Sequence, residues 1–266
     1  NIIFTTISMR FGAILNNQKF STIIIDEACQ CQEAWTWGLL RSEVTNIILA
    51  GDPQQLPAQV SDIGKKYHYD RSLMSRLIEL GVESELLSVQ RRMHPDIAKF
   101  SNECFYEGKL SSDYSLPNQE FNIPPIQIIN VDGQESQSGT SFYNELEIDK
   151  ILEIENQLRE TFNEVIIISP YKEHCQMLLK RNKKLQVHTI DSYQGKEAEA
   201  IILTTVRTGK QVGFWNDYRR LNVGMTRAKH ALRVIGKIST WSSSVGPLQK
   251  LIHYYQKNDP SVIVYP

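Results

Sequence analysis

The chain has 266 residues, of which 41% are hydrophobic and 22% are charged, as is usual for a globular protein. Its formal net charge of -1 excludes nucleic-acid binding through bulk positive charge and limits any such site to a local groove. No apolar run has the length of a transmembrane helix and the four cysteines lack a paired zinc spacing, so we expect reduced thiols in an intracellular protein that contacts no membrane.

The expected elements alternate between strands and helices along the chain. Apolar runs predict strands over residues 2–7, 22–25 and 44–50 and then, after a second unit begins near residue 90, over 126–131, 165–169, 186–190, 200–207 and 231–236. Helices are expected over 71–80, 171–180, 220–229 and 248–256, and another opens at the capping box of residues 144–147. Strands that alternate with helices form βαβ units, so we expect an α/β fold with parallel sheets flanked by helices.

Two adjacent carboxylates follow the apolar run at residues 22–25. The run is β-branched and continuous, which favours a central strand covered on both faces. Asp26 and Glu27 then lie at its carboxyl end, where open α/β sheets bind ligands. A carboxylate in that position can hold Mg²⁺ and its neighbour can activate a water, although the same acids could simply cap a following helix.

Two further motifs carry side chains suited to phosphate chemistry. The loop at residues 51–57 follows a strand and contains Gln55, whose amide can bond a phosphate oxygen and an attacking water together. Residues 90–95 place Arg91 and Arg92 before a helix start, and guanidinium groups bind phosphate oxygens in bidentate fashion. The alternatives are that residues 51–57 form an ordinary turn and that Arg91 and Arg92 are simply a basic pair on the surface.

Two later stretches complete the set. Residues 189–197 are expected to join a strand to a helix through a turn at Gly195, and residues 221–229 to form a helix that presents Arg227. In this order the motifs resemble those of superfamily-1 helicases of the up-frameshift/senataxin-like family, and the resemblance covers nearly all of the chain. It is carried by Asp26-Glu27-Ala28-Cys29, Gly51-Asp52-Pro53-Gln54-Gln55-Leu56, Gln90-Arg91-Arg92-Met93-His94-Pro95, Ile168-Ser169-Pro170-Tyr171 and the two stretches above.

The resemblance implies RecA-like domains with ATP and Mg²⁺ between them: the C-terminal half of a first domain over residues 1–89 and a complete second domain over 90–266. Asp26 would then bind the Mg²⁺, Glu27 would activate the water and Gln55 would sense the γ-phosphate. The arginine fingers would be Arg92 and Arg227.

The resemblance also implies residues that bind the nucleotide and the nucleic acid. Those expected near the nucleotide are Asp26, Gln90, Arg91, Gly195 and Glu197. Those expected near the nucleic-acid backbone are Thr5, Pro170, Tyr171, Thr189 and Arg207. Arg91 departs from the family, which usually has a Tyr that stacks on the adenine, but a guanidinium plane can also stack on a base.

A larger departure is that no Gly-x-x-x-x-Gly-Lys-Ser/Thr sequence occurs in the chain. Such a loop cradles the β- and γ-phosphates through its backbone N–H groups and its Lys. In the family it precedes the region that resembles this chain. We therefore expect a C-terminal portion of a longer enzyme, with ATP binding badly impaired in these residues alone.

The preferred hypothesis is an ATP-dependent helicase or translocase that moves 5′ to 3′ on RNA or RNA/DNA hybrids. We expect a monomer in the nucleus or cytoplasm that binds single-stranded RNA or DNA, with any regulatory proteins bound outside this chain. A DNA helicase of the repair or replication type and a non-hydrolysing nucleic-acid-binding or scaffold module stay open. The scaffold is disfavoured because it would not need Glu27, Gln55, Arg92 and Arg227.

Overall fold

The computed structural model describes residues 2–9, 12, 15, 18–113, 121–209 and 212–266. The chain divides into two compact units, unit 1 over Asn1–Leu86 and unit 2 over Leu87–Pro266. The sequence analysis placed its domain boundary between residues 89 and 90. Among the described residues, no helix is both long and apolar enough to cross a membrane.

Unit 1 contains a two-stranded parallel sheet in which β1 (Thr22–Ile25) pairs with β2 (Asn46–Leu49). The carboxyl ends of the two strands lie side by side, because Ala50 N donates to Ile25 O at 2.9 Å. Gly51 is required at this point, since a Cβ there would lie 2.9 Å from the Cys29 backbone N. Unit 1 contains the helical segments η1 (Ile7–Met9), η2 (Ala28–Gln30), α2 (Glu33–Trp37), α3 (Asp62–Lys66) and α4 (Leu73–Glu79).

Two predictions for unit 1 are wrong. Residues 2–6 form no strand, and a single turn of 3₁₀ helix follows them. The strand at residues 22–25 does form, but it is not covered on both faces by the described residues, because Ile24 is 68% exposed and its cross-strand partner Ile48 is 52% exposed. A β-branched run determines that a strand forms, whereas its burial depends on which segments pack against it.

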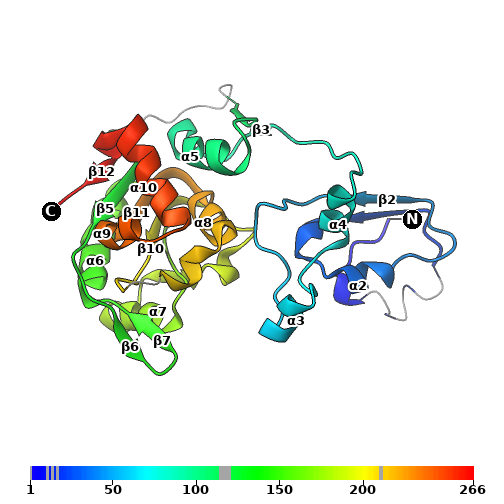
Figure 1. Cartoon of the computed structure of the whole chain (residues 1–266), viewed down its shortest axis with the longest axis horizontal. Helices are drawn as coiled ribbons and strands as arrows, with labels where there is room; N and C mark the ends of the chain where they lie inside the picture. The colour runs from blue at the N-terminus through cyan, green and yellow to red at the C-terminus, as the bar shows by residue number, and fades with distance from the viewer. Residues whose placement is uncertain (1, 10–11, 13–14, 16–17, 114–120, 210–211) are drawn as a thin grey trace. The chain divides into compact units, whose positions relative to one another are not determined.

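Unit 2 is built on a six-stranded sheet in the order β12-β5-β11-β10-β8-β9, with every neighbouring pair parallel (Figure 1). Ile166 and Ile167 are adjacent on β8 and both are buried, so both faces of the sheet are covered. The α/β fold class with helices flanking a parallel sheet is therefore confirmed. The strands are β5 (Ile126–Asn130), β8 (Val165–Ser169), β9 (Gln186–Thr189), β10 (Ala198–Thr204), β11 (Ala228–Gly236) and β12 (Ile263–Val264).

Helices and two small sheets surround this core. The helices are α5 (Pro95–Phe105), α6 (Glu145–Arg159), α7 (Lys172–Arg181), α8 (Tyr218–Met225), α9 (Ile238–Ser243) and α10 (Pro247–Asn258), with the 3₁₀ turns η3 (Asp191–Tyr193), η4 (Gly213–Asn216) and η5 (Pro260–Val262). β3 (Val89–Gln90) pairs with β4 (Ser111–Ser112), and β6 (Ser136–Ser138) forms a hairpin with β7 (Ser141–Tyr143). Ile148, Ile151 and Ile154 of α6 pack on one face of the sheet.

Some predictions for unit 2 differ from the structure in ways that change where site residues lie. The strand expected over 200–207 ends at Thr204, and residues 189–197 lead through η3 into strand β10 instead of a helix. The helix expected over 220–229 ends at Met225, so Arg227 lies between α8 and β11. The helical period continues through this segment, but residues from Ala228 onward pair with β10, and strand pairing overrides the local pattern.

Candidate nucleotide and nucleic-acid sites

The acidic pair lies exposed directly after β1 in unit 1. Asp26 Oδ1 accepts the Glu27 N–H at 3.0 Å, and Gln30 Nε2 donates to Glu27 Oε2 at 2.8 Å. Glu27 has a φ of 52°, in the left-handed region that few residues other than glycine adopt. Such strained residues cluster at functional sites, so the turn itself supports a functional role for the pair.

Gln55 lies on the loop that follows β2. Asp52 organises this loop, because its Oδ1 accepts the Gln54 N–H at 2.9 Å and its Oδ2 accepts from Gln55 Nε2 at 2.8 Å. Ala28 N donates to Ala50 O at 2.7 Å, which joins the turn after β1 to the end of β2. Gln55 and the acidic pair therefore follow neighbouring ends of one sheet.

Asp26 suits a magnesium ion that is shared with a phosphate ligand. Mg²⁺ usually takes one or two protein carboxylates together with substrate phosphates and waters. Among the described residues, no three His, Cys, Asp or Glu side chains converge on a metal position. A single exposed carboxylate fits this shared mode of binding.

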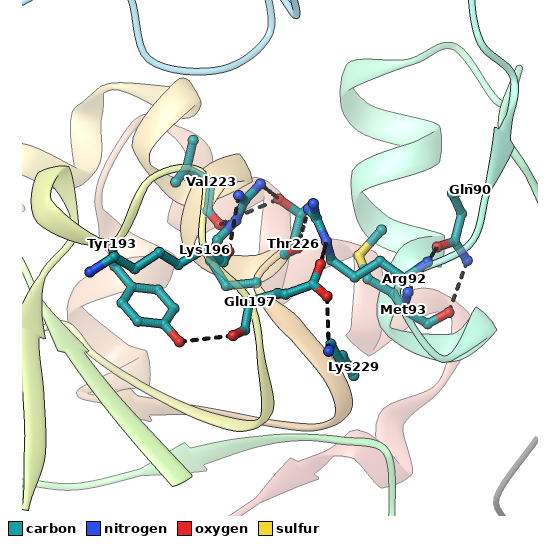
Figure 2. Close-up of polar contacts among 10 residues, drawn as sticks. Gln90, Arg92, Met93, Tyr193, Lys196, Glu197, Val223, Thr226 and Lys229 are labelled. Atoms are coloured by element: carbon teal, nitrogen blue, oxygen red, sulfur yellow. Dashed lines mark hydrogen bonds and ion pairs between the residues drawn. The ribbon is translucent and has the colours of Figure 1, made fainter. Parts of the chain in front are cut away.

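Glu197 is the centre of an ionic cluster at the amino ends of β10 and β11 (Figure 2). Arg92 Nε lies 2.6 Å from its Oε2 and Lys229 Nζ lies 2.8 Å from its Oε1. The hydrogen bond from Lys229 holds the pKa of Glu197 below its ordinary value, partial burial opposes this, and the bond from Arg92 adds to it. Arg92 Nη1 also donates to Thr226 O at 3.3 Å. Glu197 is thus ionised at neutral pH and bridges two cations.

Gln90 fixes the backbone from which Arg92 projects (Figure 2). Its Oε1 accepts the N–H groups of Arg92 and Met93 at 3.0 and 2.9 Å, and its Nε2 donates to Met93 O at 2.9 Å and to Ser112 Oγ at 2.7 Å. Every polar atom of the Gln90 amide is therefore used in shaping this turn. Arg91 leaves the same turn with a side chain that is 72% exposed and paired with Asp113 at 2.9 Å.

Arg227 is only 2% exposed. Its Nε donates to Val223 O at 3.0 Å, its Nη1 to Lys196 O at 3.3 Å and its Nη2 to Thr226 Oγ1 at 3.0 Å. The guanidinium group therefore ties α8 to the segment that contains Gly195, whose φ of 76° explains the glycine.

Tyr193 supports the same segment from the other side. Its hydroxyl donates to Glu197 O at 3.1 Å, and burial raises its pKa to about 12, so the donor stays protonated. The segment from η3 to β10 is thus anchored at both ends by residues that the sequence motif contains.

Four of the residues expected near nucleic acid lie at the opposite edge of the sheet. Pro170 and Tyr171 follow β8, Thr189 ends β9 and Arg207 follows β10, and these three strands are neighbours. Thr5 belongs to unit 1, in a segment without regular structure.

The side chain of Arg207 is held in an aromatic and acidic environment. Its guanidinium carbon lies 4.0 Å from the centre of the Phe142 ring, and its Nε donates to Glu135 Oε2 at 2.8 Å. Burial disfavours its charged form, but the hydrogen bond with Glu135 and the nearby Tyr171 hydroxyl raise the pKa of Arg207 overall. Tyr171 stacks edge-on against Phe142 at 5.6 Å. The carboxyl edge thus contains an arginine with aromatic neighbours, a combination typical of single-strand binding, and this arginine is paired with Glu135.

Two family models, each described as an AAA domain, match residues 1–62 and 69–239. The chain is 36% identical over 248 residues to Helicase SEN1 of Saccharomyces cerevisiae, covering 82% of this chain and 11% of that protein. It is 31% identical over 306 residues to the probable helicase senataxin of Mus musculus, covering 98% and 12%, and 33% identical over 274 residues to the ATP-dependent helicase NAM7 of Saccharomyces cerevisiae, covering 90% and 28%.

The chain belongs to the up-frameshift/senataxin-like family of superfamily-1 helicases. It spans less than a third of the length of each of these three relatives. Among solved structures, an arterivirus nonstructural protein 10 helicase in complex with DNA is similar at 14% identity with a TM-score of 0.45, over 82% of this chain and 40% of that one.

In this member of the family, the structure brings the predicted residues into three groups. The first group is Asp26, Glu27 and Gln55 in unit 1. The second is Arg92 and Glu197 at the amino edge of the unit 2 sheet, with Arg227 buried nearby. The third is the set of predicted nucleic-acid residues, apart from Thr5, at the carboxyl edge of that sheet. The sequence analysis missed Lys229, although it lies in the same motif as Arg227. It also missed Glu135, which no local pattern marks.

Proposed function

We propose that the protein containing this chain is an ATP-dependent helicase or translocase that moves 5′ to 3′ along single-stranded nucleic acid, with RNA or RNA/DNA hybrids as its substrates inside the cell. The observation that carries the proposal is that one chain of this family has both an exposed Asp26-Glu27 pair after β1 and the arginines Arg92 and Arg227 anchored on a second unit. The DNA-helicase alternative shares all of these residues.

We assign the nucleotide chemistry to residues of both units. When bound, ATP with Mg²⁺ supplies the phosphoanhydride bond whose hydrolysis drives movement. Asp26 holds the ion, Glu27 takes the proton of the attacking water on its carboxylate, and Gln55 orients that water through its amide. Arg92 and Arg227 neutralise charge that develops on the phosphate oxygens, for which Arg92 would exchange its present partner Glu197.

The remaining nucleotide contacts come from the turns next to Arg92 and Glu197. Arg91 is exposed enough to stack its guanidinium plane on the adenine, in place of the family's usual tyrosine. Gln90 and Gly195 shape the two turns. Nucleic acid is assigned to the carboxyl edge, at Pro170, Tyr171, Thr189 and Arg207, and to Thr5.

The experiment is a Glu27→Gln substitution in the natural polypeptide that carries these 266 residues. The variant should bind a fluorescent ATP analogue normally but hydrolyse ATP about 10²-fold or more slowly, because the amide cannot accept the proton. Single-stranded RNA should stimulate the wild type and not the variant. Glu83→Gln, an exposed glutamate of the same unit, is the matched control and should hydrolyse normally. Unchanged turnover in the Glu27 variant would remove this residue from the mechanism.

A further inference from the structure

The chain makes a strained turn directly after β10. Arg207 N donates to Thr205 O at 2.7 Å, and the residue between them, Val206, is fully buried with a φ of 65°. An i→i+2 hydrogen bond around a residue with positive φ is a γ-turn of the rare kind. A β-branched residue in this conformation is a genuine outlier, and such outliers persist only where their surroundings hold them.

The start of α6 holds both backbone polar groups of Val206. The Val206 N–H donates to Glu147 Oε2 at 3.0 Å, and Asn144 Nδ2 donates to Val206 O at 3.3 Å. Asn144 is the N-cap of α6, so its Oδ1 also accepts the Glu147 N–H at 3.3 Å. Both side chains are fully buried. The predicted capping box therefore forms only in part: Asn144 caps the helix, but its own N–H donates to His174 Nδ1, and Glu147 holds a turn on another segment instead.

Two more buried side chains, Thr204 and His174, complete this group. We call Asn144, Glu147, His174 and Thr204 together the clamp. The Thr204 hydroxyl donates to Glu147 Oε2, and His174 Nε2 lies 3.3 Å from Thr204 Oγ1. His174 Nδ1 accepts the Asn144 N–H at 3.3 Å, which places the proton of the neutral ring on Nε2. Nε2 can therefore donate to Thr204, which donates to Glu147. Each member of the network has a defined partner, so the network is rigid.

Arg207 is the residue that leaves this turn. Its side chain is held on the far side by Glu135, whose Oε2 also accepts the N–H groups of Thr208 and Gly209 at 2.6 and 3.2 Å. The backbone direction at Arg207 is thus determined by the clamp and the side-chain direction by Glu135. A relaxed Val206 would change where the Arg207 guanidinium group points.

We propose that Glu147 and Asn144 are positioning residues that hold Val206 in its strained turn and thereby aim Arg207 at a backbone phosphate of single-stranded nucleic acid. The proposal rests on the proposed function, because it requires nucleic acid at the carboxyl edge of the sheet. The proposed role belongs to a buried network that itself contacts neither the nucleotide nor the nucleic acid.

The test is a double-mutant cycle in the natural polypeptide that carries these 266 residues, with binding to fluorescent oligouridine followed by anisotropy over a salt series. Arg207→Ala should weaken binding about tenfold and reduce the salt slope by about 0.7, the value for one phosphate contact on a single strand. Glu147→Leu should reproduce both changes, because leucine has a similar size but no oxygen that could accept the Val206 N–H. The double variant should be no weaker than Arg207→Ala alone, because the two residues act through one contact.

Two further variants separate positioning from general support of the fold. Val206→Gly should restore binding to the Glu147→Leu variant, because glycine adopts this φ without strain and the turn no longer needs its clamp. Glu155→Leu, also on α6 but at a residue bonded to Arg159, is the matched control and should bind normally. If Glu147→Leu does not fold by circular dichroism, Thr204→Val removes one donor to Glu147 and is interpreted in the same way.

The outcomes distinguish this proposal from the proposed function. If Arg207→Ala weakens binding and Glu147→Leu leaves affinity and salt slope unchanged, the positioning role is refuted and the nucleic-acid site stands. Additive losses in the double variant without rescue by Val206→Gly would show that Glu147 acts only through stability. A wild-type natural polypeptide without salt-dependent binding would refute both.

Discussion

Replacing Glu147 by Gln should change how the stability of unit 2 depends on pH. Burial raises the pKa of Glu147 from 4.5 to about 7, although the hydrogen bonds from Thr204 and from the Val206 N–H oppose this. The folded state therefore keeps a proton on this carboxyl group that the unfolded chain releases above pH 4.5. Its contribution to stability is fully present below pH 4.5 and is lost as the pH rises through 7, at about 1.4 kcal/mol per pH unit.

His174 changes the pH dependence of the free energy of unfolding in the opposite direction. Burial lowers the pKa of His174 from 6.5 to about 3, so its contribution is present above pH 6.5 and is lost as the pH falls through 3. Between pH 4.5 and 6.5 the two slopes cancel in the wild type. In Glu147→Gln only the His174 slope remains, and the free energy of unfolding should rise by about 3 kcal/mol relative to wild type across this window.

The assay is urea unfolding at half-unit pH steps, followed by tryptophan fluorescence, for which the buried Trp215 and Trp241 report on unit 2. His174→Gln is the mirror control, because it leaves only the Glu147 slope and should lose stability between pH 4.5 and 7. Other titrating groups are common to all three chains and drop out of the differences. Parallel stability curves for wild type and Glu147→Gln would refute the raised pKa of Glu147.

Two substitutions test other parts of unit 2. Arg227→Ala should lower the free energy of unfolding by about 1–3 kcal/mol, because Val223 O and Lys196 O lose their buried donor. Thermal unfolding measures this change, and an unchanged melting temperature would show that Arg227 does not make these hydrogen bonds. Gly213→Ala should destabilise the unit by about 1–3 kcal/mol and weaken single-strand binding, since Gly213 has a φ of 61° and its new Cβ would lie 2.3 Å from the Tyr171 hydroxyl. Retained stability and affinity there would contradict the packing around Tyr171.

The strands of the unit 2 sheet could be predicted because their apolar runs are continuous and both faces are covered, as at residues 165–169. The end of α8 could not, because the segment at Arg227 continues the helical pattern and only its pairing with β10 turns it into a strand. The exposed face at Ile24 could not be anticipated either, since a β-branched run says nothing about which segments cover it.

The same limit applies to the candidate sites. The motifs identified Arg92 and Glu197 separately, but their ion pair joins residues 105 positions apart in the chain. Glu147 was predicted only as part of a capping box, because its partners Thr204 and Val206 are 57 and 59 positions away. Local patterns identify residue types that suit a chemistry, whereas the partners that orient them come from tertiary contacts.

Strand β10 connects the two edges of the unit 2 sheet. Glu197, which holds Arg92 and Lys229, immediately precedes its first residue, and the clamped turn that leads to Arg207 immediately follows its last. The strand is buried and paired on both sides, with β8 and β11, so it moves only as part of the sheet. In the proposed mechanism Arg92 changes partner, and the resulting rearrangement of the Glu197 cluster can reach Arg207 only by moving the whole sheet or by releasing the turn at Val206. Because Glu147 and Asn144 oppose that release, the network under the turn favours rigid-body motion of the unit, which is the behaviour that the proposed translocation along nucleic acid requires.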